Sequence, residues 1–263
     1  MIQVTRENYH DISVEREVMS RSQYLNFLKC EAAQLARLSG KWTDEPNDAF
    51  LVGSYVHSWS EGSIKEWIAE HPGMFTKSGG LKAEYKQADK MIATLEADPL
   101  AMWMLEGDKE VIFTAEFAGA VWRVMSDVYS KDKTRMVELK TNKNLRETTW
   151  NAEAQQRVNF IEQYNYMIQA ALYCEIERLA SGRPENDWLD YYMVAVSKEN
   201  YPDKEIIDLR DPDRYITELG RIERNMPRVL GVKAGGLEPF RCERCDYCRS
   251  TKLLTGAVHY TDL

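Results

Sequence analysis

Three consecutive runs rich in apolar residues set the strongest limit on the fold. They are VIFTAEF (111–117), VWRVMSDVYS (121–130) and RMVELK (135–140), and short turn segments separate them, Ala118-Gly119-Ala120 first and then a polar segment. Short runs of this composition between turn segments predict strands. Because the connections are only a few residues long, we expect an antiparallel meander.

Helical periodicity lies on both sides of this meander. Apolar residues recur at helical spacing in five segments, which are 20–38, 55–68, 81–97, 154–179 and 213–230. Two further apolar runs, 188–196 and 205–209, predict strands. The expected fold class is therefore α/β (α+β), with a central mixed sheet flanked by helices.

Composition narrows the class of protein. No stretch approaches the roughly 20 uninterrupted apolar residues of a membrane span, and the N-terminus lacks the layout of a signal peptide. We therefore expect a cytoplasmic protein with no membrane partner. With 263 residues, 44% of them hydrophobic, the chain can bury one large core. We expect a single domain, with a helical part (1–105), a part bearing the sheet (106–210) and a C-terminal helix with a cysteine-rich tail (211–263).

The formal net charge of −8 argues against broad, nonspecific adhesion to nucleic acid, which needs concentrated positive charge. It does not exclude DNA as a substrate, since a locally basic channel is compatible with an acidic protein.

The third run carries a candidate active site. Glu138 and Lys140 are two residues apart and share a strand face, and a hairpin brings Asp127 beside Glu138. Two carboxylates can hold Mg²⁺, and a lysine can orient the water that attacks a phosphodiester. An exposed cross-strand ion pair uses the same residues, so this motif alone leaves both interpretations open.

Other motifs accompany these three residues in a fixed order. GSYVH (53–57) comes first, G-x-x-x-R-x-x-x-D (119–127) and VELKT (137–141) follow, and Y-x-x-Q-x-x-x-Y (166–173) comes last. The set resembles the RecB-like and RecE-like (exonuclease VIII type) branch of the PD-(D/E)XK nucleases over residues 20–175. This resemblance implies a restriction-endonuclease-like core.

The resemblance assigns roles position by position. It implies metal ligation by His57, Asp127, Glu138 and the Leu139 carbonyl, and catalytic roles for Asp127, Glu138, Lys140, Gln169 and Tyr173. Alone, a histidine in a helix is typical of a structural residue, and Tyr166 and Tyr173 are also typical of the polar edge of a core helix.

Four residues are candidate contacts to DNA phosphate: Arg123, Thr141, Ser20 and Ser22. Arginine favours bidentate contacts with phosphate, but a surface salt bridge accounts for Arg123 equally well. Helix capping explains Ser20 and Ser22 with fewer assumptions.

The tail has three cysteines, Cys242, Cys245 and Cys248, within seven residues. Without an export signal, such a cluster is typical of metal ligation rather than disulfides. The resemblance adds Cys30, since a similarly placed cysteine completes a [4Fe-4S] cluster in iron–sulphur members such as the AddB-type nucleases. The last gap is shorter here than in those relatives, so Zn²⁺ and free thiols remain alternatives.

The resemblance implies a phage-type exonuclease that uses Mg²⁺ (or Mn²⁺) to hydrolyse linear double-stranded DNA from 5′ to 3′, for recombination by single-strand annealing. The implied partners are double-stranded DNA, an annealing protein and further copies of the chain in a ring. Two alternatives stay open. One is an endonuclease or a nuclease module of a repair or adaptation complex, and the other is an inactive relative that binds DNA or protein.

Overall fold

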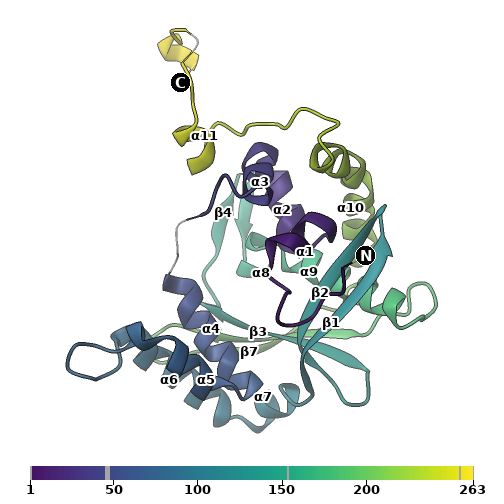
Figure 1. Cartoon of the computed structure of the whole chain (residues 1–263). Coiled ribbons are helices and arrows are strands. Elements are labelled where there is room, and N and C mark those ends of the chain that lie inside the picture. The colour runs from purple at the N-terminus through teal and green to yellow at the C-terminus, as the bar shows by residue number, and fades with distance from the viewer. Residues whose placement is uncertain (1, 45–47, 153, 255, 263) are drawn as a thin grey trace.

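The computed structural model describes residues 2–44, 48–152, 154–254 and 256–262. At its centre lies a five-stranded sheet in the order β1-β2-β3-β6-β7 (Figure 1). The strands are β1 (Asp108–Phe117), β2 (Ala120–Tyr129), β3 (Arg135–Asn142), β6 (Asp190–Ser197) and β7 (Lys204–Asp208). β3 and β6 run parallel, and the other neighbouring pairs run antiparallel. The mixed sheet and the predicted meander are confirmed.

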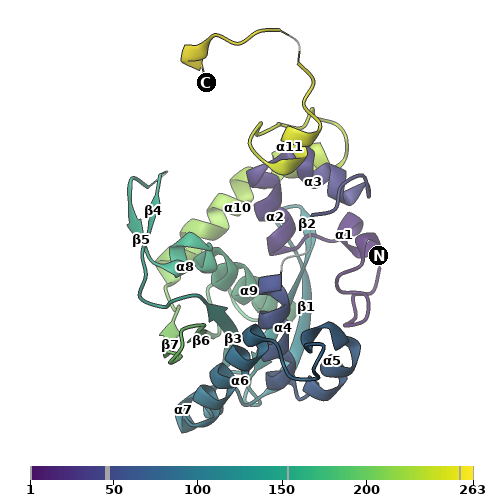
Figure 2. The same cartoon turned by 90° about the vertical axis from the view of Figure 1, so that its left-hand side faces the viewer.

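Helices cover both faces of the sheet (Figures 1 and 2). The first group is α4 (Asp48–Glu61), α5 (Ile64–Glu70), α6 (Ala83–Glu96) and α7 (Pro99–Met104). The second is α8 (Phe160–Gln163), α9 (Tyr166–Ala180) and α10 (Pro212–Lys233). On β3, Val137 and Leu139 join the core of the first group, and Met136 joins the core of the second. Because side chains alternate, Glu138 and Lys140 share the face of Met136.

Three N-terminal helices pack beside the second group. They are α1 (Ile12–Glu17), α2 (Arg21–Lys29) and α3 (Glu31–Leu38). Tyr24 and Phe27 of α2 lie in one buried cluster with Trp122 of β2 and Ile222 and Met226 of α10. This packing places the start of α2 near the sheet. None of the described helices combines the length and the apolar character that a membrane span needs.

Several helical boundaries differ from the predictions. The segment 20–38 is two helices, because Cys30 is extended (φ −164°, ψ 105°). The segment 55–68 is also divided, at Gly62, whose φ of 82° is left-handed and ends α4. The long helix predicted over 154–179 begins only at Phe160 and is interrupted at Asn165, whose φ is 55°. Periodicity over a window does not detect such breaks at single residues.

Short elements were not predicted from the sequence. A second sheet is formed by β4 (Thr149–Asn151) and β5 (Gln156–Val158), and this hairpin projects from the body (Figure 2). The others are α1, α7, α11 (Asp246–Ser250) and the short helical turns η1 (Pro72–Met74) and η2 (Tyr260–Asp262). Each is too short to show a clear period, which explains why the pattern missed them.

The sheet opens between β2 and β3. These strands pair only at Val128 with Val137 and at Tyr129 with Met136, although β2 pairs with β1 and β3 pairs with β6 over most of their lengths. Beyond Val128, Asp127 and Glu138 continue the same register without ladder hydrogen bonds. This opening makes room for side chains at the centre of the sheet.

Candidate active site

A cavity of about 880 Å³ lies where β2 and β3 separate. Its walls come from the start of α2, from α4, from α9 and from the N-terminal segment before α2. The lining includes the side chains that the sequence assigned to catalysis, which are His57, Asp127, Glu138, Lys140, Gln169 and Tyr173. The fold therefore brings together residues that are more than a hundred positions apart in the sequence.

The side chain of Asp127 takes the place of a missing backbone hydrogen bond between β2 and β3. Its Oδ2 accepts a hydrogen bond of 2.9 Å from the backbone N–H of Leu139, across the gap between β2 and β3. A buried backbone donor needs a partner, and here a carboxylate provides it. The carboxylate is thus held at a fixed position beside β3.

Lys140 contacts both carboxylates. Its Nζ donates to Glu138 Oε2 at 2.5 Å and lies 3.9 Å from Asp127 Oδ2. The Glu138 side chain is only 2% exposed. The ion pair considered from the sequence exists, but it is buried, whereas an exposed pair was the alternative to an active site. The Asp127 and Lys140 side chains are partly buried, at 17% and 23% exposed, and the burial of a charged group such as Glu138 needs a compensating reason, since removing charges from water is costly.

Burial controls the protonation of this cluster. Burial, and then the charge of Asp127, raises the pKa of Glu138 to about 7. Burial opposes the charge on Lys140, but the two carboxylates outweigh it and raise its pKa. Near neutral pH, Lys140 is therefore charged and Glu138 is close to its titration point. A divalent cation would favour the ionised form of both carboxylates.

His57 reaches the same cluster from α4. Its Nδ1 lies 3.6 Å from Asp127 Oδ2, and the Leu139 backbone hydrogen-bonds to the ring. Burial, and then the charge of Lys140, lowers the pKa of His57 to about 4. At neutral pH the ring is uncharged and keeps a lone pair. Neutral imidazole is the form that binds metal ions.

The donor set fits a hard divalent cation. Two carboxylates, a backbone carbonyl and a neutral imidazole are ligands of the types that Mg²⁺ and Mn²⁺ accept. His57 Nδ1 and Lys140 Nζ both lie within 4 Å of the same oxygen, Asp127 Oδ2. A cation here would replace the contacts of Lys140 with the carboxylates and draw the ligands together.

The buried side of α9 closes the cavity. Gln169 is buried, and its Nε2 donates to the hydroxyl of Tyr191 at 3.3 Å. The ring of Tyr173 meets that of Tyr191 edge-on, with 6.2 Å between centroids. Tyr166 stands under the guanidinium of Arg21, 5.5 Å from the ring centroid. Gln169 and Tyr173 thus have structural partners in addition to their place in the cavity wall.

Arg123 is buried, so its interpretation as a surface salt bridge is wrong. Its side chain is 1% exposed, and its guanidinium lies over the ring of Tyr9, 5.0 Å from the centroid. One nitrogen, Nη2, is 3.4 Å from Glu15 Oε1. The other two, Nε and Nη1, have no hydrogen-bond partner in the described part of the chain. A buried cation with two unmet donors is available to an anion that enters the cavity.

The remaining phosphate candidates lie at the start of α2 and on β3. Ser20 caps α2, because its hydroxyl accepts from the N–H of Gln23 at 3.3 Å, and Ser22 lies 3.1 Å away. The predicted capping role is confirmed for Ser20, but Ser22 lies inside α2 and does not cap it. Ser20, Ser22 and Thr141 all line the cavity.

Comparison with known proteins fits this geometry. The sequence matches a family described as "PDDEXK-like domain of unknown function (DUF3799)" over residues 20–251. The chain belongs to this PDDEXK-like family. The crystal structure of a candidate exonuclease from Eubacterium rectale is 36% identical in sequence. The match covers 100% of this chain and 98% of that one, with a TM-score of 0.92.

A second solved structure, that of SSO0001, shares 14% identity over 73% of this chain and 83% of its own, with a TM-score of 0.29, which is too low to support a conclusion. The comparison with curated proteins gave no significant match. Together, the family and the first structure support a nuclease of the PD-(D/E)XK superfamily.

The cavity of this PDDEXK-like protein is basic although the whole chain is acidic. Five basic side chains line it, namely Arg21, Arg123, Lys140, Lys143 and Lys198, against the acidic Glu15, Asp127 and Glu138. The sequence did not indicate Tyr9 or Glu15, because the N-terminal segment has no periodic pattern and reaches the site only through the tertiary fold. Positive charge is thus concentrated where a phosphate would bind.

Proposed function

We propose that this protein is a Mg²⁺-dependent exodeoxyribonuclease that hydrolyses linear double-stranded DNA. The observation that carries the proposal is the contact of Lys140 with Asp127 and with the buried Glu138 at the opening of the sheet, inside a basic cavity. The superfamily supports hydrolysis of phosphodiester bonds, and the related structure is described as a candidate exonuclease.

Each residue has a separate task in this proposal. Asp127, Glu138, His57 and the Leu139 carbonyl hold the cation. When bound, the cation polarises the phosphate and lowers the pKa of its water. Lys140, which is charged at neutral pH, orients the attacking water and offsets negative charge on the phosphate. Gln169 and Tyr173 fix the wall against which the substrate lies.

Phosphate binding is assigned to the basic wall. Arg123 offers two donors that have no partner among the described residues, and Ser20, Ser22 and Thr141 line the same cavity. Charge-assisted hydrogen bonds to phosphate are the strong ones. Tyr164 and Phe50 are exposed beside this wall and offer surfaces on which an unpaired base can stack.

The finer features rest on the resemblance to RecE-like enzymes. They are polarity from 5′ to 3′, a role in single-strand annealing, an annealing protein as partner and a ring of identical subunits. A ring would enclose duplex DNA in a channel to which each subunit contributes its basic cavity.

Digestion of labelled DNA tests the proposal. Linear duplex labelled at either the 5′ or the 3′ end is incubated with the full-length protein and Mg²⁺, with closed circular duplex as control. We expect release of 5′-terminal label from the linear substrate and no cleavage of the circle. Cleavage of the circle would establish an endonuclease instead. Absence of hydrolysis with both Mg²⁺ and Mn²⁺ would favour the inactive relative.

The raised pKa of Glu138 leads to a prediction about pH. Because the folded pKa of about 7 exceeds the ordinary 4.5, this group stabilises the metal-free fold below about pH 4.5, and the contribution is lost as pH rises to about 7. Between about pH 5 and about pH 8, the Tm of the metal-free protein should therefore fall relative to that of Glu138→Gln. Mg²⁺ should restore the Tm of the wild type at the higher pH and leave the Tm of the Glu138→Gln variant unchanged. Differential scanning calorimetry measures both effects, and parallel curves would contradict them.

The Arg123→Met variant tests whether Arg123 binds phosphate or only supports the fold. The buried guanidinium makes one long ion pair with Glu15 and packs on the ring of Tyr9. An apolar side chain of similar length keeps the packing on Tyr9 and removes a buried charge, so the Tm should stay unchanged or rise. DNA affinity should fall roughly 10-fold or more, as expected when charged hydrogen bonds of about 1.5–3 kcal/mol are lost. Fluorescence anisotropy with labelled duplex in Ca²⁺ measures binding without hydrolysis.

The control for this variant is Arg146→Met, which removes an exposed arginine paired with Asp203 and Glu205 outside the cavity. Unchanged affinity in Arg123→Met together with a lower Tm would show that Arg123 only supports the fold.

A further inference from the structure

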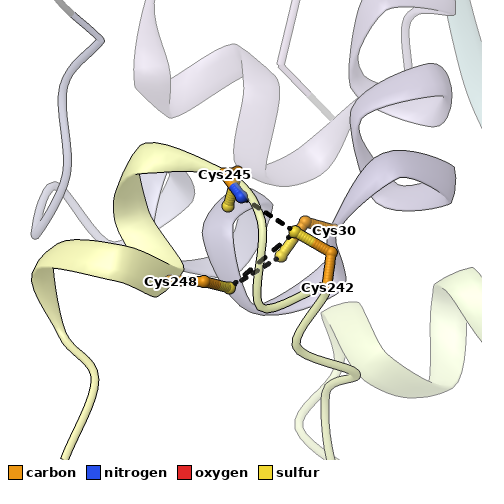
Figure 3. A group of neighbouring side chains, drawn as sticks. All are labelled: Cys30, Cys242, Cys245 and Cys248. Carbon is orange, nitrogen blue, oxygen red and sulfur yellow. Dashed lines mark hydrogen bonds between the residues drawn. The ribbon is translucent and has the colours of Figure 1, made fainter. Parts of the chain in front are cut away.

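The four cysteines that the sequence grouped lie together at the junction between the N-terminal helices and the tail. Cys30 occupies the break between α2 and α3, and Cys242, Cys245 and Cys248 come from the segment around α11 (Figure 3). Their sulfur atoms all lie within 4.8 Å of one another, and all four residues are free thiols. The two parts of this junction are far apart in the sequence, since 211 residues separate Cys30 from Cys242.

The sulfur separations distinguish between two kinds of metal centre. Cys30 Sγ lies 3.5 Å from Cys248 Sγ, and Cys242 Sγ lies 3.9 Å from the same atom. With Zn–S bonds of about 2.3 Å, a tetrahedral ion places its ligands roughly 3.8 Å apart. In a [4Fe-4S] cubane each thiolate lies beyond its own iron, so the sulfur atoms are roughly 6 Å apart. The observed group has the size of a single-ion site.

We propose that Cys30, Cys242, Cys245 and Cys248 bind one Zn²⁺ ion in a closed, tetrahedral site. Four thiolates leave no open position for water, which is the arrangement of a structural zinc site rather than a catalytic one. This second metal site is separate from the carboxylate site and does not depend on the proposed nuclease activity.

The backbone around the tail cysteines is already arranged for ligation. The N–H of Cys245 donates to Cys242 Sγ at 3.3 Å, a contact that stabilises a thiolate. Glu243, between these two cysteines, has a left-handed φ of 57°. That conformation is costly for a residue other than glycine and persists where the surroundings enforce it. A chelate ring closed by the Cys242 and Cys245 thiolates would enforce this turn.

The apolar packing around the four cysteines is small. The α11 helix has five residues, too few for a helix that is stable by itself. Besides the cysteines, its buried cluster contains only Ala32 and Ala33 among the residues that the structure describes, with Tyr247 packed against them. Polar contacts at Glu31 help, because its carboxylate accepts from Arg228 at 2.7 Å and from the N–H of Phe240 at 2.7 Å. They anchor the segment before Cys242, whereas the contacts of α11 include the ring of Tyr247 against Trp42 and a hydrogen bond that Arg241 donates to the Cys248 carbonyl.

The ion would also support the active-site wall. α2 begins at the cavity, where Ser20 and Ser22 line it, and ends at Cys30. Nine residues of helix span about 14 Å. Zinc at Cys30 would therefore fix one end of the helix whose other end faces the substrate, and Figure 1 shows the tail reaching back to α3 at this point.

Metal analysis of the full-length protein tests the proposal. Protein purified with and without oxygen is assayed for zinc, iron and acid-labile sulfide. We expect colourless protein with one zinc per chain, and loss of that zinc in Cys245→Ser. Cys174→Ala is the matched control, because Cys174 is buried in the core away from the cluster and its removal should leave the zinc content unchanged.

Two further measurements keep the test decisive if Cys245→Ser fails to fold. Wild type refolded with Co²⁺ should show the intense visible bands of a tetrahedral cobalt thiolate, and chelation should lower the Tm until Zn²⁺, but not Mg²⁺, is returned. Brown protein containing iron and sulfide would overturn the proposal in favour of a cluster. Protein that contains no metal, and gives no cobalt bands, would overturn it in favour of free thiols.

Discussion

Lys140→Ala is expected to abolish Mg²⁺-dependent DNA hydrolysis, with a loss of about 10³-fold or more, while the protein remains folded. Removal of one preorganised group that stabilises transition-state charge costs about 10²- to 10³-fold in other enzymes, and Lys140 in addition orients the attacking water. Lys140 is the only basic group in hydrogen-bond contact with Glu138 among the described residues. No neighbouring cation replaces it.

The fold should tolerate the change because Glu138 can become neutral. Loss of the lysine removes the positive charge that opposes the rise in the pKa of Glu138, so the carboxyl takes up a proton instead of remaining charged and buried. Initial rates on linear duplex give the loss of activity, and circular dichroism with the Tm monitors the fold.

Lys131→Ala is the matched control for Lys140→Ala. Lys131 lies in the turn between β2 and β3, is 75% exposed, and pairs with Asp108 away from the cavity. This variant should keep the full rate. Full activity in Lys140→Ala would remove the central argument for the site, and equal losses in both variants would point to a general effect of charge.

The strands were predictable because their signal is local. The runs 111–117, 121–130 and 135–140 are rich in apolar residues, and the turns between them are short. The parallel pairing of β3 with β6 joins segments about fifty residues apart, and alternation carries no information about such partners. The helix break at Cys30 was missed for a related reason, since the residues on both sides continue the apolar period.

The active-site residues also differ in whether a local sequence signal predicts their position. Asp127 and Glu138 could be placed together because the hairpin register follows from the length of the turn, and the order of motifs added His57 and Gln169. The separation of β2 from β3, which makes the cavity, has no counterpart in the sequence pattern. The same holds for Tyr9, whose ring lies beneath the Arg123 guanidinium.

Asp127→Asn is expected to lower the hydrolysis rate by about 10³-fold or more while leaving the strand contact intact, because a metal ligand loses its charge. The amide oxygen of asparagine can still accept the hydrogen bond that Leu139 donates to Asp127 at 2.9 Å. The side chain keeps its size, but its amide group cannot supply the negative charge that holds a hard cation. The rise in Tm that Mg²⁺ causes in the wild type should also be lost, and this readout does not require activity.

Asp127→Ala distinguishes the two roles of this carboxylate. Alanine leaves the Leu139 N–H without a partner at the opening of the sheet, which should cost about 1–3 kcal/mol of folding free energy in addition to the loss of activity. In urea denaturation of the metal-free proteins, the free energy of unfolding of Asp127→Ala should therefore lie well below that of Asp127→Asn. The value for Asp127→Asn should be close to that of the wild type. Equal stability of the two variants would show that the hydrogen bond to Leu139 does not hold β2 and β3 together. An active Asp127→Asn variant that still gains stability from Mg²⁺ would show that the cation binds elsewhere in the cavity, and the ligand set would then have to be rebuilt around Glu138 and His57.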